Sequence, residues 1–370
     1  MAEFHKILIA NRGEIAIRVM RAANEMGKST VAVFAKEDKL SLHRFKADEA
    51  YEIGEGLGPV ASYLNINEII SVAIKAGADA IHPGYGLLSE KPEFARACNK
   101  AGVSFIGPTA EIMENLGNKA NARKIAEKAG VPVIPASNIL PDDPKDLIKI
   151  AKTLEFPLML KASWGGGGRG MRLINSIEDV EKNILEGKRE AENAFGNSES
   201  FLERYIKNAR HVEVQILGDK RGNIYHLWER DCSIQRRNQK VIERAPAPYL
   251  NNKQRQAVCE MATTICKQVG YECAGTVEFL MDMDSNKFFF IEVNPRIQVE
   301  HTITEEVTGI DIVRAQIMLS EGANLNEAIG KKNQSDIVCN GHAIQCRITT
   351  EDPLNNFIPD YGRITAYRGA

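Results

Sequence analysis

Apolar and polar positions near the amino terminus follow the pattern of a β-α-β unit. The run KILIA at 6–10 is short and continuously apolar, as is TVAVF at 30–34, and both are typical of buried strands. Between them, apolar residues recur on one helical face from Ile15 to Met26, and Gly27 ends the helix. Two strands joined through a helix are the starting point of an α/β fold.

The same alternation continues toward residue 115. Apolar runs at 78–82 and 103–106 predict two further strands, and a helical pattern at 92–101 separates them. Strands that alternate with helices in this way build a parallel sheet. We therefore expect residues 1–115 to form a parallel-sheet, Rossmann-like domain.

The rest of the chain predicts three more segments. Residues 116–132 have a helical pattern and form a linker, and 133–205 form a smaller unit with two strand-like runs, which we expect to be a mobile lid. From 206 to 370, strand-like runs alternate with helical patches at 253–268 and 309–320. The prediction is an α/β fold whose last part is a partial α+β domain.

Charge and composition exclude several classes of protein. The chain is 44% hydrophobic and 26% charged, an ordinary balance for a globular protein, and its formal net charge is only -2. Without a global positive field it has little means to attract nucleic acid or an anionic membrane, so an anionic ligand must be held by local cations. No apolar run approaches the roughly 18 residues of a membrane span.

The seven cysteines form neither a metal nor a disulfide pattern. They include no C-x-x-C pair, and Cys259, Cys266 and Cys273 follow helical rather than zinc-ligand spacing. We expect reduced, mostly buried thiols. The chain runs straight into an apolar strand without a signal-like segment, which favours a cytoplasmic protein, or one of the mitochondrial matrix if a transit peptide has been removed.

A glycine-rich segment, SWGGGGRGMR at 163–172, lies between the two strand-like runs of the expected lid. Consecutive glycines cost chain entropy and pack nothing, but their backbone N–H groups approach a phosphate closely. Lys161 and Arg169 add cations that match phosphate oxygens, and a floppy hairpin turn is the alternative. The segment lacks the ending of a Walker A loop, and the turn at Gly13 has too few glycines for a dinucleotide fingerprint.

Polar side chains alternate with apolar ones in FFFIEVNPRIQVEH, residues 288–301. In an extended strand alternate side chains share a face, so Ile291 and Val293 are expected to face the core. The opposite face then carries Glu292, Asn294, Arg296, Gln298 and Glu300. Pro295 is expected to bend the strand, so this shared face holds only for short stretches on either side of it. Glu278 adds a carboxylate within the apolar strand GTVEFLM. Because carboxylate and amide oxygens suit magnesium, Glu278, Glu292 and Asn294 are predicted to bind it; a solvated sheet face is the alternative.

The basic stretch RDCSIQRRNQK at 230–240 is a further candidate for anion binding, with donors from Gln235 and Lys240. On spacing alone, a solvated charged face is the favoured interpretation. Cys232 lies within this stretch, but no histidine stands beside it in sequence to activate a thiolate.

Two histidines have other interpretations. His82 opens HPGYG at 82–86, where proline and glycine are explained by a tight structural turn. His301 follows Glu300 and either orients that carboxylate or takes part in chemistry itself.

Together, the glycine-rich segment, its preceding lysine and the carboxylate-amide cluster describe an ATP site held between two domains. Six ordered motifs resemble the biotin carboxylase part of biotin-dependent carboxylases, a branch of the ATP-grasp superfamily: ILIANRGEIAIRV, HPGYGLLSE, KASWGGGGRGMR, HVEVQILGD, ERDCSIQRR and FIEVNPRIQVEHTITE. Trp164, ERAPAPYL at 243–250 and the segment 349–370 are more similar to pyruvate carboxylases than to acetyl-CoA or propionyl-CoA carboxylases.

The resemblance implies a reaction and its reactants. In this family ATP phosphorylates bicarbonate to carboxyphosphate, and a biotin ureido nitrogen is then carboxylated. The implied cofactors are ATP, Mg²⁺ or Mn²⁺, and biotin, which is a substrate carried on a separate domain. The implied partners are that biotin-carrying domain and, in a full-length protein, further copies of the chain in a homo-oligomer.

The resemblance also implies roles for individual residues. Lys119, Lys161 and the lid glycines Gly166, Gly167 and Gly168 match ATP-phosphate contacts. Glu203 and Ile206 match positions around the adenine, His211 and Gln235 match nucleotide contacts, and Asn238 stands where many relatives have a histidine near the ribose. Glu278, Glu292 and Asn294 match the magnesium ligands. Lys240, Arg296, Gln298 and Val299 match groups around bicarbonate, Glu300 matches its base, and Arg347 matches the arginine proposed to stabilise the biotin enolate.

Other functions remain open at this point. The chain is alternatively another ATP-grasp ligase that makes an acyl phosphate from a different carboxylate, or a catalytically silent binding or assembly module. A nicotinamide-dependent dehydrogenase is disfavoured by the turn at Gly13. Because a complete biotin carboxylase module continues past residue 370, we expect a truncated chain whose third domain and biotin pocket are incomplete.

Overall fold

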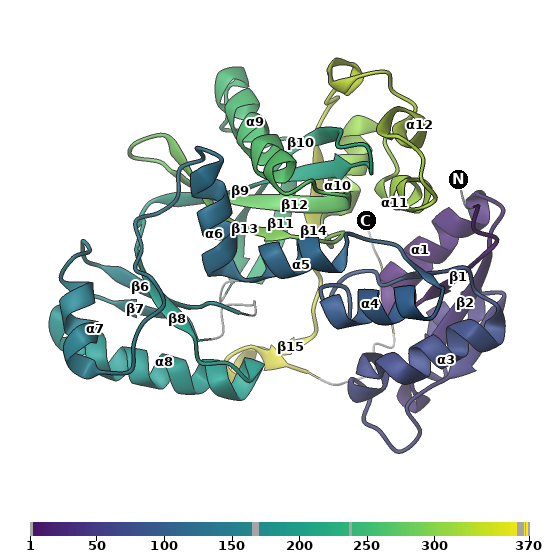
Figure 1. Ribbon diagram of the computed structural model, residues 1–370, viewed down its shortest axis with the longest axis horizontal. Helices are drawn as coiled ribbons and strands as arrows, with labels where there is room; N and C mark the ends of the chain where they lie inside the picture. The colour runs from purple at the N-terminus through teal and green to yellow at the C-terminus, as the bar shows by residue number, and fades with distance from the viewer. Residues whose placement is uncertain (1–2, 165–169, 237–238, 361–365, 367, 369–370) are drawn as a thin grey trace.

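The computed structural model describes residues 3–164, 170–236, 239–360, 366 and 368. Figure 1 shows a parallel-sheet domain and a small three-stranded unit on opposite sides of a six-stranded sheet. This arrangement is the α/β architecture that the sequence predicts.

The amino-terminal domain is a five-stranded parallel sheet in the order β3-β2-β1-β4-β5. Its strands are β1 (Lys6–Ile9), β2 (Ser29–Phe34), β3 (Glu49–Glu52), β4 (Ala80–His82) and β5 (Ser104–Phe105), and its helices are α1 (Gly13–Glu25), α2 (Leu42–Lys46), α3 (Ile66–Ala76) and α4 (Pro92–Lys100). Ile7, Leu8 and Ile9 are fully buried, which explains why β1 is continuously apolar. Gly27 has a positive φ and follows α1 closely, as predicted.

The helical linker predicted at 116–132 contains α6 (Lys119–Lys128), and α5 (Ala110–Gly117) precedes it, mostly within the segment 1–115. Asn118 separates them, because its extended backbone cannot continue α5 while its side chain accepts a hydrogen bond from the backbone N–H of Asn121 and caps α6. Both helices pack against β13 of the large sheet. The linker therefore belongs to the wall of the large sheet rather than to a free connection.

The small unit carries a three-stranded antiparallel sheet in the order β7-β6-β8. It contains α7 (Pro144–Ala151), β6 (Leu158–Ala162), β7 (Arg172–Ile174), α8 (Val180–Phe195) and β8 (Ser200–Arg204). Leu147, Leu160 and Ile184 join the helices and sheet in a buried cluster of their own. A separate core of this kind is what a unit that moves as a lid requires.

The large sheet is antiparallel in the order β13-β12-β9-β10-β11-β14. Its strands are β9 (Ala209–Gly218), β10 (Ile224–Arg236), β11 (Gln239–Ala245), β12 (Cys273–Asp282), β13 (Lys287–Asn294) and β14 (Ala343–Cys346), and its helices are α9 (Asn252–Gln268), α10 (His301–Thr308), α11 (Ile312–Ser320) and α12 (Leu325–Ile329). The helical patch predicted at 309–320 starts later, since Gly309 has a positive φ at the end of α10 and Asp311 caps α11.

One hydrophobic core joins the amino-terminal domain to the large sheet. Ile9 of β1, Leu217 of β9 and Val313 of α11 belong to the same buried cluster. These two parts therefore share a core, whereas the buried cluster of the small unit contains no residue of either.

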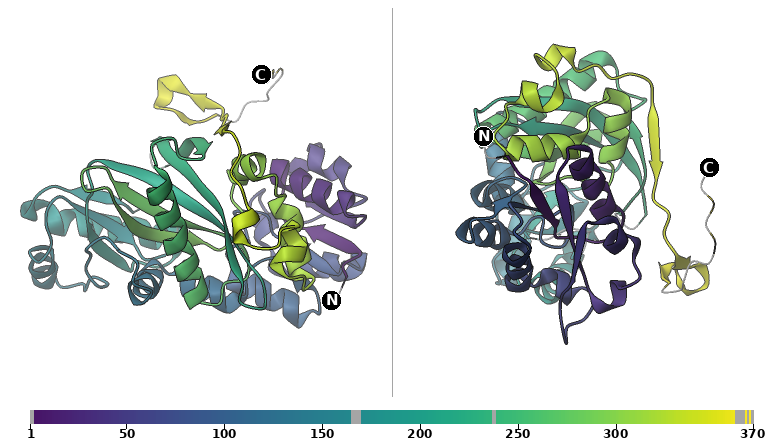
Figure 2. Two further views of the ribbon diagram at one scale, coloured as in Figure 1. Left: turned by 90° about the horizontal axis from the view of Figure 1, so that it is seen from above. Right: turned by 90° about the vertical axis from the view of Figure 1, so that its right-hand side faces the viewer.

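Short elements complete the chain. A two-stranded ribbon, β15 (Glu351–Asp352) with β16 (Ile358–Pro359), stands away from the rest of the molecule in Figure 2. Five 3₁₀ turns lie at Lys36–Asp38, Ala61–Leu64, Ile177–Asp179, Gln334–Asp336 and Pro353–Asn355. In the part of the chain that the structure describes, no helix is both long and apolar enough to cross a membrane.

Candidate functional site

Four charged residues lie in one row across the large sheet. Arg230 of β10 pairs with Glu213 of β9, Glu213 pairs with Glu278 of β12, and Glu278 pairs with Glu292 of β13. Residues paired directly across strands share a face, so three carboxylates stand side by side. Like charges in that arrangement repel one another, and such a row persists only where cations offset it. This row is the floor of the candidate site.

Lys240 supplies the central cation. Its Nζ lies 2.7 Å from Oε1 of Glu278 and 2.8 Å from Oε1 of Glu300, and it also bonds Oε2 of Glu213. Burial alone would lower the pKa of Lys240, but these carboxylates raise it well above its ordinary value. Lys240 is therefore a permanently charged ammonium.

Glu300 lies between two cations. Oε1 accepts from Lys240, and Oε2 accepts from Arg347 at 2.8 Å. Burial would raise the pKa of Glu300, but Lys240, Arg230 and Arg347 outweigh it and lower the pKa to about 2. Glu300 is therefore a carboxylate at neutral pH, bonded on both oxygens.

Glu278 is the most heavily bonded of the predicted magnesium ligands. Besides Lys240, its Oε1 accepts from Nδ2 of Asn294 at 2.8 Å and from Nε2 of Gln298 at 3.0 Å, while Nε2 of His211 lies 2.8 Å from Oε2. Burial lowers the pKa of His211, but Glu278 more than reverses this and raises it above its ordinary value. The predicted carboxylate-amide cluster is therefore assembled.

Glu292, another of the predicted magnesium ligands, has a side chain that is more exposed to solvent than that of Glu278. Its Oε2 lies 2.8 Å from Nζ of Lys119, and a quarter of its side chain is exposed. Two carboxylates and the amide Oδ1 of Asn294 are hard oxygen donors, which fit Mg²⁺ when phosphate and water oxygens complete the shell. His211, Glu213 and Glu278 also bring ligand atoms within 4.8 Å of one another, but Lys240 already bonds both of these carboxylates.

The strand that was expected to bend at Pro295 does not continue beyond Asn294. β13 ends there, residues 295–300 form an irregular turn, and α10 begins at His301. Pro295 has no N–H for a sheet ladder, which explains the break. The polar residues still converge, because the turn brings Gln298 and Glu300 back over the face that carries Glu278.

Arg296 lies at the edge of the site nearest the amino-terminal domain. Its Nε donates to Oε1 of Glu90 at 2.7 Å, and another guanidinium nitrogen donates to Oδ1 of Asn294 at 3.0 Å. Val299 is half-buried in the same turn. Arg296 therefore connects the amino-terminal domain with the predicted magnesium ligands.

The predicted nucleotide residues form a second group between the lid and the large sheet. Nζ of Lys161 lies 2.5 Å from Oε1 of Glu203, and the backbone N–H of Lys119 donates to the carbonyl of Ser163. Ile206 is buried with Phe289 in a small apolar cluster, which offers a surface for a flat ring. Nε2 of Gln235 lies 3.1 Å from Nδ1 of His211. Gly166, Gly167, Gly168 and Asn238 lie outside the described residues.

The structure also bears on the predictions made for Cys232, His82 and His301. Cys232 is completely buried, and burial raises the pKa of its thiol well above its ordinary value, so it is no nucleophile. His82 is fully buried and its Nδ1 accepts from the N–H of Gly84 within the turn, which confirms the structural interpretation. His301 contacts the carbonyl of Gln298 through Nδ1 at 2.6 Å, rather than the Glu300 carboxylate as one interpretation expected.

Sequence reasoning missed four residues that hold the site together. Glu213 and Arg230 are fully buried within the charged row, Glu243 accepts from Nε of Arg347 at 2.6 Å, and Glu90 accepts from Arg296. The alternation in HVEVQILGD was the available signal for Glu213, because a glutamate between Val212 and Val214 stands on the polar face of its strand. Arg230, the first residue of the basic stretch at 230–240, is therefore buried and is not part of a solvated charged face.

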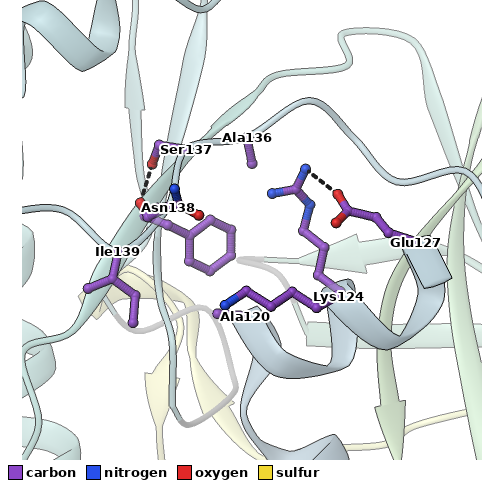
Figure 3. Close-up of a pocket in the computed structure, with 9 residues that line it drawn as sticks. Ala120, Lys124, Glu127, Ala136, Ser137, Asn138 and Ile139 are labelled. Carbon is purple, nitrogen blue, oxygen red and sulfur yellow. Dashed lines mark hydrogen bonds and ion pairs between the residues drawn. The ribbon is translucent and has the colours of Figure 1, made fainter.

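A cavity of about 520 Å³ adjoins the site on the lid side. Figure 3 shows it between one face of α6, with Lys124 projecting inward, and the segment Ala136–Ile139. Arg123 and Glu127 form an ion pair at 3.0 Å across its wall. Ala120, which also lines it, directly follows Lys119, so the cavity borders the nucleotide group without containing any of the carboxylates of the charged row.

Two parts of the chain match known protein families. Residues 118–328 match the family described as carbamoyl-phosphate synthase L chain, ATP binding domain, and residues 3–113 match biotin carboxylase, N-terminal domain. Pyruvate carboxylase from Staphylococcus aureus is 55% identical over 375 residues, a match that covers 100% of this chain and 32% of that protein.

Solved structures agree closely. A pyruvate carboxylase structure from Rhizobium etli superposes with a TM-score of 0.95 at 62% identity, covering 99% of this chain and 33% of the other. The biotin carboxylase domain of 2-oxoglutarate carboxylase from Hydrogenobacter thermophilus, in complex with MgADP, ADP and bicarbonate, gives a TM-score of 0.92 at 46% identity, covering 97% of this chain and 78% of the other. The present chain thus spans about a third of the length of the curated relatives it matches.

Proposed function

Because this chain belongs to the biotin carboxylase family and has its ATP-grasp fold, we propose that it uses ATP and bicarbonate to carboxylate biotin, the first half-reaction of a pyruvate carboxylase. The observation that supports this most strongly is the pairing of the Glu278–Glu292 metal ligands with a base, Glu300, in one cation-bridged cluster. A domain that only binds ATP requires metal ligands such as Glu278 and Glu292. It does not require a buried base such as Glu300 beside them.

On the nucleotide side, Lys119 and Lys161 are placed to neutralise phosphate oxygens, and Glu203 and Ile206 to hold the adenine. Glu278, Glu292 and Asn294 would hold Mg²⁺, which supplies charge neutralisation at the phosphates when it is bound. Lys119 and Lys161 form ion pairs with Glu292 and Glu203. We infer that these ion pairs keep both ammonium groups in place until phosphate replaces the carboxylates.

On the bicarbonate side, Arg296, Lys240 and Gln298 hold the anion while Glu300 removes its proton. The bicarbonate oxygen then attacks the γ-phosphorus, the bond to the β-phosphate oxygen breaks, and ADP and carboxyphosphate form. A carboxylate with a pKa of about 2 is a weak base. A bound anion changes this, since its negative charge next to Glu300 raises that pKa and it competes for Lys240.

The C–O bond of carboxyphosphate then breaks to give CO₂ and phosphate, the phosphate takes the proton of the biotin ureido nitrogen, and that nitrogen bonds the carbon of CO₂. Arg347 is placed to stabilise the negative charge on the biotin ureido oxygen, because its guanidinium already bonds Glu300 and Glu243 beside the bicarbonate groups. The biotin-carrying domain, a homo-oligomer and a cytoplasmic or mitochondrial location belong to the same proposal.

ADP release tests the proposal in a full-length protein that contains this chain. We expect release to require bicarbonate and to rise when free biotin is added. Release that depends on a different carboxylate would instead identify another ATP-grasp ligase, and release that ignores bicarbonate would overturn the proposal. A silent assembly module would fail to bind MgATP in a calorimetric titration.

Glu292→Ala should weaken magnesium-dependent nucleotide binding. The variant removes one of two hard carboxylate ligands, so we expect the Mg²⁺ concentration that gives half-maximal ATP affinity to rise at least about tenfold, which corresponds to roughly 1.4 kcal/mol. Calorimetric titration of ATP at a series of Mg²⁺ concentrations measures the shift. Glu306→Gln, at an exposed position of α10, is the control and should leave the titration unchanged.

A further inference from the structure

We propose that Arg230 is a positioning residue for the bicarbonate half of the site, and that it acts by fixing the side chains of Gln298 and Glu213. Arg230 is completely buried and belongs to none of the substrate-contacting groups described above. The inference rests on the proposed function, since it assigns Arg230 a positioning role in the same reaction.

The guanidinium of Arg230 uses every donor it has. Nε donates to Glu213 at 2.6 Å, one terminal nitrogen donates to Gln215 at 2.8 Å and Thr304 at 2.9 Å, and the other donates to Thr276 at 3.2 Å and Gln298 at 2.8 Å. These acceptors come from β9, β12, α10 and the turn before α10. A planar, rigid fork whose donors are all bonded has one orientation only.

The first consequence concerns Gln298. Because Oε1 of Gln298 accepts from Arg230, its Nε2 must point the other way, where it donates to Oε1 of Glu278 at 3.0 Å. Without the fork, the two ends of the amide are nearly equivalent, and a flipped amide would turn an oxygen toward the Glu278 carboxylate. Arg230 therefore decides which end of Gln298 faces the site.

The second consequence concerns Glu213. Arg230 bonds Oε1 of this glutamate, which leaves Oε2 to bond Lys240. Glu213 thus transmits the position of the fork to the ammonium that also holds Glu278 and Glu300. The guanidinium of Arg230, two strands away from Glu278 in the charged row, therefore governs Gln298 and Lys240, two of the groups that would hold bicarbonate.

Arg230→Lys tests the inference, because lysine keeps the charge and loses the fork. In a full-length protein that contains this chain, we expect the KM for bicarbonate to rise about tenfold while the KM for ATP stays within about twofold. If Arg230 acts through Gln298, the same change made in a Gln298→Ala background should raise that KM by less than about threefold. Equal changes in both KM values would overturn the inference, and a full tenfold effect in the Gln298→Ala background would overturn the part of it that acts through Gln298.

A second variant keeps the test usable if the lysine variant does not fold. Thr304→Val removes one anchor of the fork from the α10 side, and we expect a rise of about two- to threefold in the bicarbonate KM alone. Thr308→Val is the matched control, since its hydroxyl bonds the carbonyl of Thr304 one turn further along α10 and does not contact Arg230. Thr304→Val and Thr308→Val with the same bicarbonate KM would contradict the assignment. Absence of bicarbonate-dependent ADP release in the unmodified protein would instead reject the proposed function itself.

Discussion

We expect Glu300→Gln to reduce bicarbonate-dependent ADP release by about 100- to 10,000-fold, the usual contribution of a general base. Glutamine has the shape of glutamate, but it takes up no proton at neutral pH, and its single amide oxygen accepts from only one of Lys240 and Arg347. ATP binding should change little, because the nucleotide groups Lys161 and Glu203 lie on the lid and contact each other rather than Glu300.

Steady-state ADP release and a calorimetric ATP titration together measure this prediction. Glu306→Gln makes the same chemical change on the exposed side of α10 and should retain full turnover. Turnover of Glu300→Gln within about threefold of the unmodified protein would remove Glu300 from the role of base.

Lys240→Met should cause the largest loss of stability that we expect at this site, about 3–5 kcal/mol at pH 7. The variant leaves the carboxylates of Glu213, Glu278 and Glu300 buried without the cation that bonds all three. An uncompensated buried charge is far more costly than a lost pair, because the remaining group keeps its desolvation penalty. Activity should be lost as well.

The pH dependence of this loss gives a sharper test. In the unmodified protein the folded-state pKa of Glu300 is about 2, below its unfolded value of roughly 4.3, so its contribution to stability is complete above the unfolded pKa and disappears as the pH falls through about 2. In Lys240→Met, burial dominates and raises the carboxylate pKa values. The stability difference between the two proteins should therefore shrink between pH 7 and pH 5.

Urea unfolding followed by tryptophan fluorescence measures both predictions, since half-buried Trp228 of β10 packs against the two largest cores. Lys287→Met, at the exposed start of β13, is the matched control and should unfold like the unmodified protein at both pH values. A stability loss of Lys240→Met that is equal at pH 7 and pH 5 would show that the three carboxylates are not the cause.

Much of the fold could be predicted from hydrophobic pattern alone. The buried strand at β1, the amphipathic helix α1 and the glycine that follows it are local features, so period and turn chemistry were enough. The break after Asn294 was harder, because five polar residues of one parity continue past Pro295 and imitate a strand. These polar residues still lie close together, because the turn that follows β13 folds back over Glu278.

The sequence indicates which side chains of the candidate site lie together where they share a strand, but not where separate strands meet. Parity identified Glu292 and Asn294, and the family resemblance supplied Lys240 and Arg347, but neither shows which carboxylates surround an ammonium. Glu213 and Arg230 acquire their importance from register, since only the pairing of β9 with β10 and β12 places them beside Glu278. Register across long sequence separations depends on tertiary packing, which a single sequence does not display.

Transfer of oxygen from bicarbonate to phosphate tests the central claim most directly. If bicarbonate attacks the γ-phosphorus, the bond formed joins a bicarbonate oxygen to phosphorus, and that oxygen stays with phosphate when carboxyphosphate releases CO₂. With fully ¹⁸O-labelled bicarbonate and a full-length protein that contains this chain, mass spectrometry of the product should show inorganic phosphate with a single labelled oxygen, formed together with ADP. Unlabelled phosphate, released at the same rate as ADP while biotin is carboxylated, would contradict the account.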